Sequence, residues 1–99
     1  MNNESWLEWC TKQMSDLSRR LRTQGYNPAR LEFLANANPE FSSVFNDFMN
    51  RLEEIMNLIA ENPDAFHLYD DFAEAKKSFL TYTNLHRATY LETNLAHIA

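Results

Sequence analysis

Residues 39–61, PEFSSVFNDFMNRLEEIMNLIAE, decide the fold of this chain. Apolar side chains recur there at alternating steps of three and four residues for almost three heptads, which is the spacing of one helix face. Val44, Met49 and Met56 widen that face. The segment therefore predicts a long central helix with one buried side. The repeat consists of Phe41, Phe45, Phe48, Leu52, Ile55 and Ile59.

All three prolines follow an asparagine, and each Asn-Pro pair predicts a helix start. An asparagine side chain accepts a hydrogen bond from a first-turn amide, and proline suits the next position because its missing N–H is not needed there. The pairs are Asn27-Pro28, Asn38-Pro39 and Asn62-Pro63. Ser5, three residues before Glu8, predicts a fourth start as a capping box.

The segments on either side of the central helix also have helical spacing. The first helix carries a narrow apolar seam and ends near Gly25, a natural residue to follow a helix. Residues 64–98 carry two stripes slightly out of phase, and β-branched residues with a possible asparagine cap at 81–84 predict a break there. The first seam consists of Leu7, Cys10, Met14, Leu17 and Leu21.

These patterns predict one all-α domain over residues 1–99, without a β-sheet. The expected architecture is a small bundle of four to five helices, because no alternating strand pattern or two-residue hairpin turn occurs. The predicted helices cover about 5–24, 28–36, 39–61, 64–82 and 84–97.

Composition excludes several classes of function. With Gly25 as its only glycine, the chain cannot form the glycine-rich loops that hold phosphates or dinucleotides. Cys10 is the only cysteine, and its place on the apolar seam predicts a buried thiol rather than a nucleophile. The N-terminus lacks the pattern of a signal peptide, and no stretch approaches ~20 apolar residues. We expect a cytoplasmic protein without a cofactor, a membrane span or enzymatic activity.

One cluster of side chains has the chemistry of a metal site. His67, Asp71 and Glu74 share a helix face at spacing i, i+4, i+7, with Asp70 beside them. A complete site needs ligands from a second helix, and no Glu-x-x-His partner motif exists. An acidic, solvated face beside a partly buried histidine is the favoured interpretation. A metal- or ligand-binding bundle that uses His67 and residues 70–74 is the alternative.

Charge is divided unevenly along the chain. Residues 11–30 hold five cations against one acid, a net charge of +4, whereas residues 31–75 hold ten acids against Arg51, a net charge of −9. Nucleic-acid binding through the basic cluster is a third possibility, but acids on the central helix would repel phosphate, so a nucleic-acid partner is not favoured. The basic cluster includes Arg19, Arg20, Arg22 and Arg30.

These observations favour a protein-interaction module: a stoichiometric inhibitor, adaptor or assembly factor. Small acidic helical proteins of this class occur among phage-encoded inhibitors of host systems. The narrow seams also suit a homodimer, in which a seam packs against its copy. The candidate partner-binding residues are aromatic anchors and charged side chains on helix faces. They are Trp6, Trp9, Arg19, Arg20, Arg22, Glu53, Glu54, Asp70 and Asp71.

Overall fold

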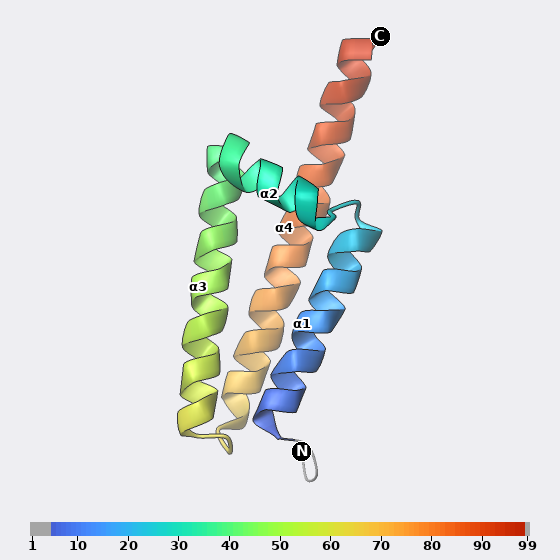
Figure 1. Cartoon of the computed structure of the whole chain (residues 1–99). Helices are drawn as coiled ribbons and strands as arrows, with labels where there is room; N and C mark the ends of the chain where they lie inside the picture. Colours follow the sequence, from blue (N-terminus) through green and yellow to red (C-terminus); the bar gives the residue numbers. More distant parts are fainter. Residues whose placement is uncertain (1–4, 99) are drawn as a thin grey trace.

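A computed structural model describes the backbone of residues 5–98 and the side chains of residues 5–87. Four helices and no strand occur in this part of the chain: α1 (Trp6–Thr23), α2 (Pro28–Ala37), α3 (Pro39–Glu61) and α4 (Phe66–Ile98). Figure 1 shows α1, α3 and α4 along a common direction, with α3 antiparallel to the other two and α2 crossing one end. The predicted all-α bundle is confirmed.

Three of the four predicted helix starts are confirmed by their caps. The side chains of Ser5, Asn27 and Asn38 each accept a hydrogen bond from the amide three residues later, at 2.8–3.1 Å. The Asn62-Pro63 pair does not begin a helix, so this prediction is wrong. The Asn62 amide donates to the carbonyl of Leu58 and ends α3, and α4 begins only after a turn. Asn62 therefore caps the end of α3 instead of the start of α4, which the sequence predicts.

The core is built largely from aromatic rings where α3 packs against α4. Phe41 and Phe72 are fully buried, and Phe48 stacks on Phe79 with ring centroids 4.2 Å apart and planes within 4°. Cys10 is 1% exposed, as the seam on the first helix predicts. The periodic face of residues 39–61 thus forms the centre of the core, since five of its members are buried. These are Phe41, Phe48, Leu52, Ile55 and Ile59.

α4 is one continuous helix, so the predicted break near 81–84 and the separate helix 84–97 are wrong. Thr83 is fully buried against the end of α1. Its hydroxyl donates to Oε1 of Gln24 at 2.6 Å and lies 3.0 Å from the carbonyl oxygen of Leu80. Nε2 of Gln24 donates to the same carbonyl at 3.2 Å. Tertiary hydrogen bonds therefore outweigh the weak helix preference of the threonines.

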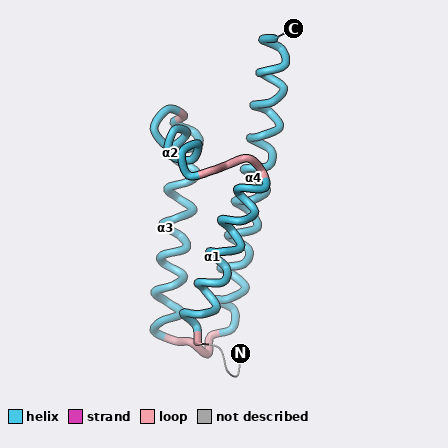
Figure 2. The backbone as a smooth tube through the Cα atoms, turned by 45° about the vertical axis from the view of Figure 1, so that its right-hand side comes forward, coloured by secondary structure: helices cyan, strands magenta, loops and turns pink. Residues whose placement is uncertain are grey.

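The last turns of α4 extend past α2 and past the end of α1 (Figures 1 and 2). The molecule consequently measures 55 × 23 × 21 Å, although α1 and α3 are much shorter than its long axis. None of the described helices contains an apolar stretch long enough to cross a lipid bilayer.

Candidate partner-binding surfaces

A groove runs between α3 and α4, with a volume of about 380 Å³. Its floor combines the stacked pair Phe48 and Phe79 with the small side chain of Ala75. The groove forms because each helix contributes side chains at steps of three and four residues, which lie on one face. The remaining lining residues are Val44, Asp47, Arg51, Asp71, Glu74, Ser78 and Tyr82.

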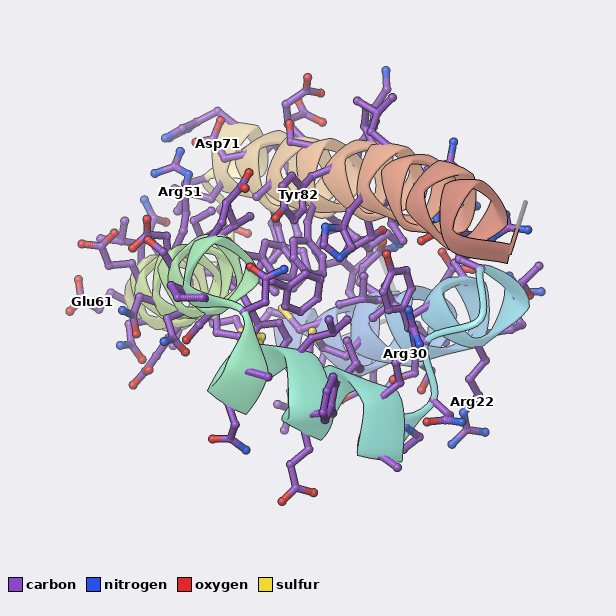
Figure 3. The ribbon with its side chains drawn as sticks, turned by 90° about the horizontal axis from the view of Figure 1, so that it is seen from above. Arg22, Arg30, Arg51, Glu61, Asp71 and Tyr82 are labelled. Atoms are coloured by element: carbon purple, nitrogen blue, oxygen red, sulfur yellow. The ribbon has the colours of Figure 1, made fainter. Side chains whose placement is uncertain are left out.

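The rim of this α3/α4 groove is acidic. Asp47 on α3 and Asp71 and Glu74 on α4 contribute three carboxylates, against the single guanidinium of Arg51. Asp71 is half-buried, whereas Asp47, Glu74 and Arg51 are exposed. Figure 3 shows Arg51 and Asp71 on the side of the α3–α4 pair that faces away from α2. The groove is therefore accessible on the side of the bundle that no other described helix covers.

Tyr82 closes one end of the α3/α4 groove and lies between the two helices (Figure 3). Its hydroxyl is buried and has no hydrogen-bond partner among the described residues, and the same holds for Nε2 of His86, whose ring stacks 6.0 Å away. Burial raises the pKa of the Tyr82 phenol, and the charge of Glu40 raises it further. A buried polar atom without a partner is uncommon in folded proteins.

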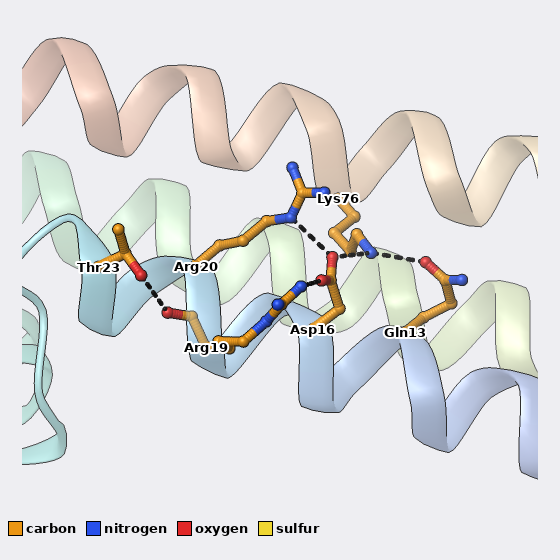
Figure 4. A network of polar contacts seen from close by, with 6 residues as sticks. All are labelled: Gln13, Asp16, Arg19, Arg20, Thr23 and Lys76. Carbon is orange, nitrogen blue, oxygen red and sulfur yellow. Dashed lines mark hydrogen bonds and ion pairs between the residues drawn. The ribbon is translucent and has the colours of Figure 1, made fainter.

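The arginines of α1 are partly engaged within the molecule (Figure 4). The carboxylate of Asp16 forms ion pairs with Arg19, with Nε of Arg20 at 2.8 Å and with Nζ of Lys76 at 2.9 Å. Lys76 also donates to Oε1 of Gln13 at 2.6 Å. The hydrogen bonds from Lys76 and Arg19 hold the pKa of Asp16 well below its usual range. This network joins α1 to α4 and neutralises part of the basic cluster.

A second groove, of about 630 Å³, lies between α1 and α3. Met14, Met56 and the buried Cys10 line its base, and burial raises the pKa of the Cys10 thiol. Arg19 and Arg22 stand at its margin. The other lining side chains are hydroxyl-bearing: Thr11, Ser15, Ser18 and Thr23.

The two tryptophans pack against the bundle and remain partly exposed. Trp6 and Trp9 are half-buried and pack against the core. Trp9 meets Tyr69 edge-on, with ring centroids 4.9 Å apart, and Phe72 at 5.4 Å. Trp9 is therefore held in place by two aromatic neighbours, and its role in binding a partner stays a prediction.

The other predicted site residues are divided among several surfaces. Asp71 lines the α3/α4 groove, whereas Asp70 is exposed and is not part of its lining. Glu53 and Glu54 border a shallow hollow on α3 that adjoins the groove and shares Asp47 and Arg51 with it, but they are not part of the groove lining. Arg30 is half-buried, with its guanidinium 6.0 Å from the centroid of the Tyr26 ring. The candidate residues therefore do not form one site.

The candidate metal ligands are not gathered into a cluster. Within the described residues, no group of three or more histidine, cysteine, aspartate or glutamate side chains is placed to hold a metal ion. His67 is exposed, so the expectation of a partly buried histidine is wrong. Asp71 and Glu74 instead face the α3/α4 groove.

Sequence reasoning did not identify the groove, although it identified most of the aromatic side chains beneath it. The missed residues are Arg51, Ala75 and Ser78, together with Asp47 and Glu74 as rim acids of one site. The available signal was the helical spacing of residues 71, 75, 78 and 82, in which two small side chains lie between two larger ones. Comparison with known proteins found no protein-family model, no curated protein and no solved structure that matches this chain.

Proposed function

We propose that this chain is a non-enzymatic protein-interaction module, which binds another protein stoichiometrically as an inhibitor, adaptor or assembly factor. The observation that carries the proposal is the α3/α4 groove, in which an aromatic floor adjoins an acidic rim. Apolar surface supplies binding free energy, and charged groups at the edge of an interface supply orientation and a fast encounter.

The charge distribution of the folded molecule supports this proposal. The acids of residues 31–75 lie on α2, α3, the turn after α3 and the first part of α4, whereas Asp16 pairs with Arg19 and Arg20 on α1. The acidic side chains thus carry the larger charge, and three of them, Asp47, Asp71 and Glu74, line the α3/α4 groove. Such a surface attracts partners of positive charge over distances of about a Debye length.

The proposal is tested by affinity capture from a lysate of the native host with two matched charge reversals. The first variant carries Asp71→Lys and Glu74→Lys on the groove rim, and the second carries Glu53→Lys and Glu54→Lys outside the groove. We expect one dominant protein at near-stoichiometric amount with the unmodified chain. The rim variant should lose it, and the second variant should retain it.

Light scattering of the purified complex then gives its mass and stoichiometry. Captured nucleic acid in place of a protein would contradict the proposal, as would the absence of any partner that responds to the rim charges. Circular dichroism of each variant confirms that the helices are intact.

A further inference from the structure

We infer that the α3/α4 groove binds an amphipathic helix of a partner protein, with a short apolar stripe and lysine or arginine on both flanks. This inference rests on the proposed function and names the chemistry of the partner. Three features of the groove carry it: its shape between two helices, its small floor residues and the signs of its rim charges.

The shape of the groove fits a helix. Its lining on α4 runs from Asp71 to Tyr82, which corresponds to ~17 Å of helix at 1.5 Å per residue. The two walls are antiparallel helices, and α1 already packs against α4 on another side of the same pair. An incoming helix would therefore complete a bundle of four long helices, an arrangement that side-chain packing between helices favours.

The floor of the groove lets a helix approach closely. Ala75 is half-buried and Ser78 is exposed, and both side chains are small. The axes of packed helices lie about 8–10 Å apart, and the shorter separations require small side chains at the contact. The small floor residues therefore allow a partner helix to approach α4 closely. The half-buried side chains of Val44, Ala75 and Tyr82 supply the accessible apolar surface for anchor side chains at spacing i, i+4, i+7. The stacked aromatic pair of the floor is buried beneath them.

The rim determines the charge of the partner. Asp47 stands on the α3 wall and Asp71 and Glu74 stand on the α4 wall, so both flanks of an incoming helix meet carboxylates. Arg51 is the only cation in the lining, and it would meet one acidic or neutral position on the partner. Opposite charges across such an interface raise the association rate and reject acidic helices.

The test uses two designed peptides of about 18 residues, long enough for partial helicity in water. Both carry the same apolar stripe, and one has lysine where the other has glutamate on the flanks. Binding to the full chain is measured by fluorescence anisotropy of a dye on the peptide. We expect the lysine peptide to bind at least about tenfold more tightly than the glutamate peptide. Its affinity should fall as salt rises from about 0.1 M to about 1 M.

Two tryptophan substitutions locate the binding site. Ser78→Trp fills the α3/α4 groove from an exposed position, and Ser18→Trp places the same ring at an exposed position in the groove between α1 and α3. We expect Ser78→Trp to weaken binding of the lysine peptide by at least about tenfold and Ser18→Trp to change it by less than about twofold. Thermal unfolding of both variants verifies folding, and Asp71→Lys with Glu74→Lys provides a second test that leaves the floor intact.

Several outcomes would overturn the inference. These are no binding of either peptide, equal affinity for the two peptides, or equal effects of the two tryptophans. A dimer of the chain itself that Ser78→Trp dissociates would assign the groove to a second copy and would also overturn it. A host protein whose capture needs the rim acids but tolerates Ser78→Trp would refute the helical occupant and leave the proposed function in place.

Discussion

Asp16 is the residue whose electrostatic environment is most clearly defined. Its side chain is 23% exposed, and the Lys76 side chain that it pairs with is 12% exposed. The interaction joins two helices that are far apart in sequence, whereas the ion pairs with Arg19 and Arg20 are within α1. Exposed ion pairs within one helix contribute little to stability. The ion pair between Asp16 and Lys76 is therefore the one whose contribution to the free energy of unfolding can be tested.

The pKa of Asp16 predicts a specific pH dependence of stability. Because Lys76 and Arg19 lower this pKa in the folded protein, the unfolded chain takes up the proton first as pH falls. The contribution of Asp16 is therefore fully present above the unfolded pKa of about 3.9 and is lost progressively below it. We expect Asp16→Asn to be less stable than the unmodified chain at neutral pH, with the difference shrinking below about pH 4.

Urea unfolding of the two proteins between neutral and acidic pH measures this difference. A double-mutant cycle with Lys76→Met separates the contribution of this pair from other effects of the substitution. A difference that stays constant over the whole pH range would show that the Asp16 carboxylate has no net interaction in the folded state.

The junction between α1 and α4 explains why one helix boundary could be predicted from the sequence and another could not. The end of α1 was predictable because a glycine commonly follows the last turn of a helix, where the backbone turns to positive φ. Gly25 has a φ of +98° there, and the amide of Tyr26 donates to the carbonyl of Leu21 at 2.8 Å. The continuity of α4 was not predictable, because it depends on Gln24 and on the Tyr26 hydroxyl, which donates to the carbonyl of Thr83 at 2.8 Å.

Gln24→Ala tests whether this junction supports α4. The substitution removes one bond to the carbonyl of Leu80 and leaves the buried Thr83 hydroxyl without its glutamine acceptor. We expect a loss of about 1–2 kcal/mol in the free energy of unfolding, together with faster amide exchange over residues 81–87. Thr83→Val is the matched variant, and the double mutant should cost less than the sum of the two single changes. Strict additivity would mean that the two side chains do not cooperate.

The candidate site shows where a single sequence stops being informative. Helical spacing predicted the buried Phe48 and Phe79, because apolar periodicity reports which face is covered. It could not show that Asp47 and Asp71 would stand on opposite walls of one groove, since that depends on how α3 and α4 pack. The exposed Glu53 and Glu54 are as acidic in the sequence, yet they lie in an adjoining hollow and not in the groove lining.

The elongated shape of the bundle is a feature that solution experiments can check. The Cα radius of gyration is 15.8 Å, whereas a compact domain of this length has a value of about 13 Å. The excess arises because the last turns of α4 extend past the other helices (Figures 1 and 2).

Small-angle X-ray scattering of the monomer should therefore give a radius of gyration of at least 15.8 Å once side chains and hydration are included. A concentration series, extrapolated to infinite dilution, removes any contribution from association. A monomer value near about 13 Å would mean that the end of α4 folds back onto the bundle in solution.

The single thiol of the chain is a built-in probe of how often the native bundle opens. Cys10 is 1% exposed at the base of the groove between α1 and α3, and burial raises its pKa, so its reaction with a thiol reagent requires that groove to open further. The rate of labelling thus counts opening events of the native bundle, with no engineered probe. A partner that occupies the α3/α4 groove stabilises the closed state by mass action. It should therefore lower the labelling rate of Cys10 without contacting the sulfur.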